Sequence, residues 1–437
     1  MVRKMIKLMT KAFRIASDEG VGTALQRSWK KINGKLGGKT GNSRQGRGYY
    51  PWDTSFEERV NSLCRGHMNG KNTAVYLYEN PDSSTFRYRA YNMCQALEHS
   101  NKWVGAYFFS YELGQLREYV RHISLAVAVR YRWDESLDNF LAECRKNKIS
   151  TAMDLDDMVF DTGNIKLFMN AIGESMTDEN ALNYWFSSFS RIDSTAALYG
   201  SFSSTNEFLA EKLRKFYNKP SFCVKNFMNR EQLDISASLK REKRSGAGFV
   251  IGYFSGSPTH RHDLGHISGE LADAMEKFPG IKLKITGYMD VPQPLAKFLR
   301  SKRVVLEKFR DYRELQRTIA GVDLNIVPLA GNDFTDCKSE LKFFEAAVVD
   351  TPTCASPAFT YRNAITHGKN GYLCGTGEWH GMIKDLYNNG ISDMIVNNAK
   401  KYALQNYSPE SQVKPLEEAL DGMAGEHNEA AGGRADA

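Results

Sequence analysis

The residues best suited to chemistry lie close together, near one predicted helix start. A buried strand is predicted at Asp323–Leu329, and a helix is expected to begin soon after it, near Lys338. A helix start offers unpaired backbone N–H groups and a positive dipole end, and both favour a phosphate group. A carboxylate one turn further along can accept hydrogen bonds from ribose hydroxyl groups. We therefore expect a phosphate and ribose site made by Lys338, Ser339, Glu340, Lys342 and Glu345.

A second loop with potential chemistry follows the strand predicted at Phe249–Phe254. Small residues there let a ligand approach the backbone, and a Pro-Thr pair suits a turn into a helix. Imidazoles would lie at the mouth of a cleft. The pattern also fits a tight turn with surface histidines, and the sequence leaves both interpretations open. The residues concerned are Gly256, Ser257, Thr259, His260 and His262.

Clustered carboxylates end another predicted strand, in the sequence DLDDMVFD, at Asp154, Asp156, Asp157 and Asp161. Such a cluster can hold a metal ion or supply a general base. Because no His or Cys accompanies them at metal-ligand spacing, we favour substrate contacts or helix capping over a metal site. We predict no metal and no cofactor. A P-loop, a Gly-x-Ser-x-Gly elbow and an H-E-x-x-H motif are all absent from the sequence.

The elements that would position these residues form two series. Short apolar runs alternate with amphipathic stretches from Asn72 onward, and a polar segment, 236–246, interrupts the alternation before it resumes at Phe249. Continuous apolar strands between helices indicate parallel sheets covered on both faces. We predict an α/β protein with two doubly wound, Rossmann-like domains and a cleft between them.

The predicted domain boundaries follow from these patterns. Residues 1–48 form a basic helix and linker, 49–240 the first Rossmann-like domain and 241–395 the second. A helix at 396–422 crosses back to the first domain, and 423–437 is disordered because it lacks periodicity.

Composition narrows the class of protein. The chain has 437 residues, 42% of them hydrophobic, and a formal charge of +7. Twelve Lys and Arg fall within residues 1–48 against two acidic residues, so the remainder is slightly acidic and nucleic-acid binding is not expected. Seven scattered cysteines without a C-x-x-C pair argue against disulfides and zinc, and favour a reducing cytoplasm.

The N-terminal residues 1–16 place apolar side chains on one helical face and Lys and Arg on the rest. That pattern is typical of a helix lying on an anionic membrane surface. Packing on the protein itself or on a partner are the alternatives. Lys7 and Lys11 interrupt any apolar core, so a secretion signal is not expected, and no run is long enough to span a membrane.

The arrangement resembles the nucleotide-sugar half of GT-B glycosyltransferases, specifically the retaining family-4 group and its bacterial polysaccharide, O-antigen or rhamnan-type subset. The resemblance rests on the strand, the Lys-Ser-Glu-Leu-Lys helix, the Pro352–Ser356 strand and His367–Gly371 (HGKNG), and it covers roughly residues 72–410. The loop at Gly256 is similar to the Gly-Ser-x-Thr-His loops of that subset.

The resemblance implies roles for individual residues. Glu345 matches the second Glu of the family's Glu-x7-Glu motif, whereas Cys337 stands where the first Glu is expected, so Asn332, Asp333 or Asp336 would take over part of its role. We expect Glu345 and His260 to be catalytic, and Tyr312 to contact the base. Ser257, Thr259 and Gly256 would contact the donor diphosphate. The acceptor would be bound by Arg87, Arg89, Asp156 and Asp157, with the arginines on an acceptor phosphate.

The function expected from this resemblance is metal-independent, retaining transfer of a sugar from a nucleotide-sugar to a glycan or lipid-linked glycan, at the inner face of the membrane. A catalytically inactive GT-B module that binds a glycan or a partner is the alternative, supported by Cys337. A third is another GT-B-like enzyme, such as an epimerase or a polyol-phosphate transferase.

Overall fold

The computed structural model describes residues 50–239, 248–256, 262–287 and 289–432. Residues 1–53 form a unit separate from 54–437. In the described end of that unit, the rings of Tyr50 and Trp52 stack with centroids 4.7 Å apart. The basic helix and linker predicted within residues 1–48 lie outside the described residues.

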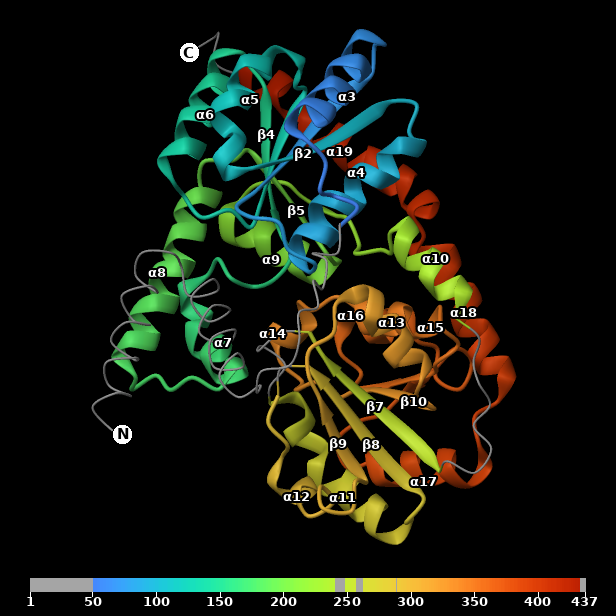
Figure 1. The fold of residues 1–437 in the computed structure, drawn as a ribbon. Coiled ribbons are helices and arrows are strands. Elements are labelled where there is room, and N and C mark those ends of the chain that lie inside the picture. Colours follow the sequence, from blue (N-terminus) through green and yellow to red (C-terminus); the bar gives the residue numbers. More distant parts are fainter. Residues whose placement is uncertain (1–49, 240–247, 257–261, 288, 433–437) are drawn as a thin grey trace, which may run out of the picture. The chain divides into compact units, whose positions relative to one another are not determined.

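The first sheet has six parallel strands in the order β2-β1-β3-β4-β5-β6 (Figure 1). Strand β3 is buried along its whole length, as expected for a sheet covered on both faces. The strand order reverses between β1 and β3, and such a switch point opens a crevice at the carboxyl ends of the strands. The strands are β1 Asn72–Tyr78, β2 Trp103–Phe109, β3 Leu125–Val129, β4 Ser150–Leu155, β5 Ser201–Ser204 and β6 Ser221–Cys223.

The second sheet repeats this plan in the order β12-β11-β10-β7-β8-β9, again parallel (Figure 1). Its switch point lies between β7 and β10. The strands are β7 Phe249–Ser255, β8 Ile281–Gly287, β9 Val304–Glu307, β10 Leu324–Val327, β11 Thr353–Ala355 and β12 Tyr372–Leu373. The prediction of two doubly wound sheets is therefore confirmed.

Helices connect the strands of each sheet. Those of the first half are α3 Phe56–Met68, η1 Arg87–Tyr91, α4 Asn92–Ala96, η2 Leu97–His99, η3 Ser110–Glu112, α5 Leu113–Leu116, η4 Arg117–His122, α6 Glu135–Lys146, η5 Thr162–Asn164, α7 Ile165–Ile172, α8 Glu179–Ala196, α9 Glu207–Tyr217 and α10 Arg230–Ser238. The second half has η7 Asp263–Ile267, α11 Ser268–Lys277, α12 Gln293–Ala296, α13 Tyr312–Ala320, α14 Asp333–Asp336, α15 Leu341–Ala347, α16 Phe359–Ala364, α17 Trp379–Asn389, α18 Asp393–Tyr407 and α19 Pro409–Gly432.

The last two helices join the two halves. Tyr407, at the end of α18, stacks on Phe344 of α15 with ring centroids 4.6 Å apart. Helix α19 then reaches the first sheet, where Asp421 accepts a hydrogen bond of 2.8 Å from the indole N–H of Trp103. Gly422 lies against the ring of Phe222, where a Cβ would come within 2.4 Å. The segment 396–422, for which the sequence suggested one returning helix, holds parts of two helices, α18 and α19.

Helix α19 also extends further than that segment. It continues to Gly432, so residues 423–432, which were expected to be disordered, are helical in the structure. Ser150 of β4 donates a hydrogen bond of 3.0 Å to the carbonyl of Ala424, and this contact holds the helix beyond Gly422.

Candidate functional site

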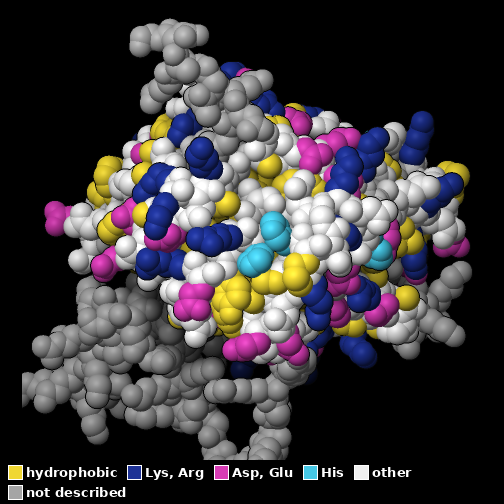
Figure 2. Space-filling model, turned by 90° about the horizontal axis from the view of Figure 1, so that it is seen from above, with side chains coloured by type: hydrophobic (Ala, Val, Ile, Leu, Met, Phe, Trp, Pro, Cys, Tyr) yellow, Lys and Arg dark blue, Asp and Glu magenta, His cyan; other side chains and the backbone are white. Residues whose placement is uncertain are grey.

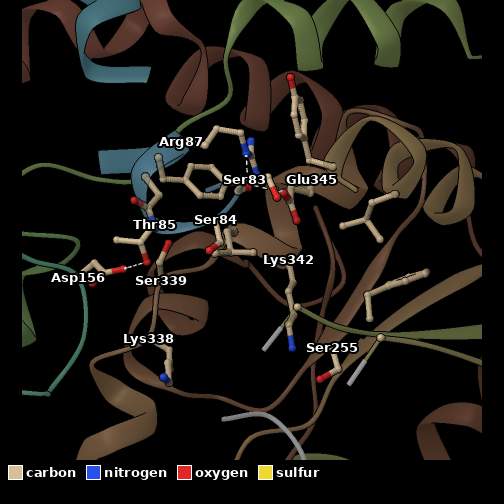
Figure 3. Close-up of a pocket in the computed structure, with 18 of the residues that line it drawn as sticks. Ser83, Ser84, Thr85, Arg87, Asp156, Ser255, Lys338, Ser339, Lys342 and Glu345 are labelled. Carbon is tan, nitrogen blue, oxygen red and sulfur yellow. Dashed lines mark hydrogen bonds and ion pairs between the residues drawn. The ribbon is translucent and has the colours of Figure 1, made fainter. Parts of the chain in front are cut away.

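A cavity of about 340 Å³ lies where the carboxyl ends of the two sheets meet (Figure 3). The first half lines it with the loops after β1, β3, β4 and β6. The second half contributes the ends of β7, β8 and β10, the start of α13 and the segment 338–345. Because both switch points open here, the topology itself brings these loops together.

Glu345 projects from α15 to the junction of the two halves and is only 4% exposed. Its Oε1 atom accepts a hydrogen bond of 2.5 Å from the Tyr88 hydroxyl and one of 3.3 Å from Gln232 Nε2. The Arg87 guanidinium lies 3.6 Å from the same oxygen. The carboxylate is therefore held in one orientation by side chains of the first half.

Arg87 does not have the position expected of an acceptor-phosphate ligand. Its Nε donates to the carbonyl of Ser83 at 2.9 Å, and its guanidinium lies 4.0 and 4.4 Å from the ring centroids of Tyr88 and Tyr312. Burial alone would lower the pKa of Arg87, but the neighbouring Tyr88 and Glu345 have the larger effect, so the pKa is raised. The side chain lines the cavity, yet its charge faces Glu345.

Arg89, two residues along the same π-helical turn η1, is a structural cation. It pairs with both carboxylate oxygens of Asp154, at 2.9 and 2.6 Å, and donates to the carbonyl of Val224 at 2.6 Å. Only 1% of it is exposed and it does not line the cavity. Its partners lie in the interior of the first half. One of them, Asp154, belongs to the cluster of four carboxylates.

Lys342 lines the cavity and is 8% exposed. Within the described part of the chain, its Nζ atom has no hydrogen-bond partner. Burial lowers the pKa of this ammonium to about 8, an effect strengthened by Lys338 and opposed by Asp263 and Glu345. The ammonium also lies 5.2 Å from the ring centroid of Tyr253. Burying a cation without a hydrogen-bond partner is costly, so the cavity beside Lys342 favours an anionic ligand.

The predicted helix start at Lys338 is wrong. Helix α14 ends at Asp336, and the next helix, α15, begins only at Leu341. Lys338, Ser339 and Glu340 therefore lie in the loop that connects the two helices. Asn206 fixes this loop by donating to the carbonyl of Cys337 at 2.9 Å, and Thr360 by donating to that of Lys338 at 2.8 Å. The loop is thus rigidly placed, although it offers no helix terminus at Lys338.

The three loop residues point in different directions. Lys338 lines the cavity and pairs with Asp157 of the first half at 2.6 Å. Ser339 also lines it, and its buried Oγ lacks a hydrogen-bond partner among the described residues. Glu340 is directed away from the cavity and accepts a hydrogen bond of 2.7 Å from Tyr407. Burial raises the pKa of Glu340, which favours an internal role over donor contact.

Asp156 and Asp157 follow β4 and line the cavity, and their contact with an acceptor stays a prediction. Asp156 accepts hydrogen bonds from Thr85 at 2.9 Å and from Arg130 at 3.3 Å. Burial acts to raise the pKa of Asp157, but Lys338 and Arg130 outweigh it and hold the pKa below its ordinary value. Both carboxylates are therefore embedded in a charge-balanced network.

The loop after β7 is only partly described. Gly256 lines the cavity, whereas the predicted donor contacts Ser257 and Thr259 and the predicted catalytic His260 lie outside the described residues. Next to it, Gly287 has φ +115°, and a Cβ there would lie 1.9 Å from the carbonyl oxygen of Ser255. A glycine is required at this position to let β7 and β8 end side by side at the cavity.

The residues proposed to replace the missing first Glu do not line the cavity. Cys337 is fully buried. Asn332 caps α14, Asp333 pairs with Lys212 at 2.7 Å, and Asp336 accepts a hydrogen bond of 2.7 Å from the Phe359 backbone N–H. Tyr312 lines the cavity, as do Phe309 and Leu315, and its contact with a base stays a prediction.

Metal binding was predicted to be absent. Among the residues that the structure describes, no three His, Cys, Asp or Glu side chains are grouped in a way that could hold a metal ion. The prediction concerns the reaction and stays a prediction.

Comparisons with known proteins bear on the fold. No protein-family model matches the chain, and no curated protein matches its sequence. Among solved structures, HepE from Anabaena in complex with UDP and glucose superposes with a TM-score of 0.53, at 14% identity, over 80% of this chain and 100% of that one. A glycosyltransferase from Rickettsia africae gives a TM-score of 0.53 at 10% identity, over 81% and 98%. TarM gives 0.50 at 16%, over 72% and 57%. The chain therefore has the GT-B fold.

Proposed function

We propose that this protein is a glycosyltransferase that moves a sugar from a nucleotide-sugar donor to a glycan acceptor. The observation that carries the proposal is Lys342, a buried ammonium that has no hydrogen-bond partner among the described residues and lies in a cavity at two facing switch points. Such a cation suits a donor diphosphate. The similarity of fold to HepE, which was solved with UDP and glucose, supports a nucleotide-sugar as that ligand.

The donor would lie along the second sheet. Lys342, Ser339 and the backbone at Gly256 would bind the diphosphate, with Lys338 at its edge. Glu345 would accept hydrogen bonds from the ribose, since its orientation is already set by Tyr88. Tyr312 would contact the base.

During the reaction, the bond between the anomeric carbon and the diphosphate oxygen breaks, and a bond to the acceptor hydroxyl oxygen forms. Negative charge develops on the leaving diphosphate, where Lys342 stabilises it. In the retaining reaction that we propose, the acceptor proton passes to the leaving phosphate, so no side-chain base is needed. The lysines would supply the charge stabilisation that a divalent cation supplies elsewhere, and we propose that the reaction is metal-independent.

The biological setting belongs to the same proposal. We infer a role in bacterial surface polysaccharide synthesis, such as O-antigen or a rhamnan-type polymer, within the family-4 group. Residues 1–16 would attach the protein to the inner face of the membrane. In the part of the chain that the structure describes, no helix has the length and apolarity needed to cross a bilayer.

The second candidate is a GT-B module that binds but does not catalyse. Cys337 favours it, because a fully buried thiol occupies the position of the first motif carboxylate. Both candidates predict donor binding, and only the first predicts product.

A thermal-shift panel of nucleotide-sugars and nucleoside diphosphates, run on the full chain and on Lys342→Met, tests the proposal. One ligand series should raise the Tm of the full chain and raise that of the variant much less, because binding to the folded state stabilises it. Lys400→Met is the matched control, since Lys400 pairs with Asp350 away from the cavity. If no nucleotide raises the Tm of the full chain, the proposal is wrong.

A further inference from the structure

The two ends of the cavity differ in hydrogen-bonding character. At the end formed by the first half, the Thr85 hydroxyl donates its proton to Asp156, and the Ser84 hydroxyl donates its proton to Asp82 at 3.0 Å. The lone pairs of both hydroxyls and of the Asp156 carboxylate remain available. This wall, formed by Ser84, Thr85 and Asp156, therefore presents mainly hydrogen-bond acceptors to a ligand.

Among the residues that the structure describes, the same end has no surplus of positive charge. Arg130 lies 3.3 Å from Asp156, and Lys338 lies 2.6 Å from Asp157. The two arginines that the sequence suggested for a phosphate are paired with Glu345 and Asp154. Every charged side chain identified at this wall is thus balanced by an opposite charge.

The other end has the opposite character. Lys342 is more than nine-tenths buried and has no hydrogen-bond partner among the described residues. Figure 3 shows its ammonium directed toward Ser255, whereas Thr85, Asp156 and Ser339 lie together on another side of the cavity. An anionic ligand is favoured beside Lys342 and disfavoured beside Asp156.

We propose that the acceptor is an uncharged sugar, bound through its hydroxyl groups at the Ser84, Thr85 and Asp156 wall. This rests on the proposed function and specifies its second substrate. Sugar hydroxyls donate hydrogen bonds to the acceptors on this wall. An ionised phosphate or carboxylate offers only acceptors, so it would meet unpaired lone pairs and two carboxylates.

Saturation-transfer NMR on the full chain tests this with defined probes. Methyl glycosides of glucose, galactose, mannose and rhamnose would be compared with glucose 6-phosphate, mannose 6-phosphate and glucuronic acid. We expect at least one neutral glycoside to bind and the anionic sugars to bind at least tenfold more weakly. In Asp156→Asn and in the isosteric Thr85→Val, binding of the neutral probe should fall at least fivefold.

The control is Asp161→Asn, which alters the same acidic segment at a residue that caps a turn by accepting from Gly163 N–H at 2.8 Å and does not line the cavity. It should bind the neutral probe like the unaltered chain. Tighter binding of an anionic sugar, no binding of any neutral glycoside, or unchanged binding in both Asp156→Asn and Thr85→Val would overturn the inference. Calorimetry with the nucleoside diphosphate separates the two proposals. Asp156→Asn and Thr85→Val should still bind the nucleoside diphosphate. If the unaltered chain does not bind it, the result counts against the donor site and not against the acceptor wall.

Discussion

Lys342 combines two properties that rarely occur together: its side chain is buried, and among the described residues its ammonium has no hydrogen-bond partner, only the ring of Tyr253 at 5.2 Å. Its carbonyl is anchored by Asn325 Nδ2 at 3.0 Å, so the backbone that carries it is fixed. Since an unpaired buried charge destabilises the folded state, its retention is best explained by a ligand.

Replacing Lys342 by Met should therefore have opposite effects on stability and binding. The free energy of unfolding of the unliganded protein should rise by about 1–3 kcal/mol, because a desolvated charge is removed with little change of shape. The affinity for the nucleoside diphosphate should fall by about 1–3 kcal/mol, as for a lost charge-assisted contact. Urea unfolding and calorimetry measure the two quantities. A variant that is less stable and binds equally well would identify Lys342 as a structural residue.

Binding should also depend on pH. The pKa of Lys342 is lowered by burial to about 8, so above that pH the free protein loses the ammonium that the diphosphate requires. Affinity should be constant up to about pH 7.5 and then fall, approaching tenfold per pH unit above about 8. Calorimetry from pH 6.5 to 9.5 measures this. A flat profile for the unaltered protein, or the same decline in Lys342→Met, would exclude Lys342 as its source.

The same pKa shift determines how the free energy of unfolding depends on pH. Because the folded pKa is depressed, the unfolded chain binds the proton more readily, so this group costs stability below its folded pKa. The cost disappears as pH rises from about 8 toward the ordinary lysine value.

At the scale of elements, the turn η1 serves two purposes. Arg87 and Tyr88 reach Glu345, whereas Arg89 reaches Asp154 in the core of the first half. Residues one or two positions apart on a helical turn point in different directions, so one short turn supplies contacts to both places.

Arg89→Met should consequently destabilise the folded protein, because Arg89 acts as a structural residue and not only as an acceptor ligand. Removing the guanidinium leaves the buried Asp154 carboxylate without its cation, and a loss of roughly 3–5 kcal/mol is expected. Chemical unfolding measures it, and Asp154→Asn in the same background should recover part of the loss. Unaltered stability together with weaker acceptor binding would return Arg89 to the acceptor site.

How far the sequence predicted these elements depended on the range of the interactions. The alternation of apolar runs and helices identified both parallel sheets, because strand burial is written into local composition. The loop before α15 was missed, because one of the two contacts that fix it comes from Asn206 in the other half. Tyr88 and Gln232 were missed as partners of Glu345 for the same reason, since no local pattern reports contacts across 257 and 113 residues.

At the scale of the whole molecule, the formal charge of +7 does not describe one basic surface. Figure 2 shows a face on which Lys and Arg side chains are interspersed with Asp and Glu. This mixture agrees with the sequence, in which the excess of positive charge falls within residues 1–48.

Membrane attachment should therefore depend on the N-terminal residues. The full chain should sediment with liposomes containing anionic lipid at low salt. Salt at about 0.5 M screens the attraction between the basic residues and the lipid strongly, so it should release the protein. A chain without residues 1–48 should keep its Tm and stay in the supernatant. Equal sedimentation of both chains would contradict this and favour packing of the helix on the protein itself.

Detection of the transferred sugar is the most direct test of the central claim. The full chain would be incubated in EDTA with the nucleotide-sugar selected by thermal shift and with a panel of neutral glycans, and the products identified by mass spectrometry. We predict a glycosylated product and release of nucleoside diphosphate, with rates at least tenfold lower in Glu345→Gln and Lys342→Met and unchanged in Lys400→Met. Donor binding without product under any condition would establish the inactive module, and product equal in all three variants would place the reaction outside this cavity.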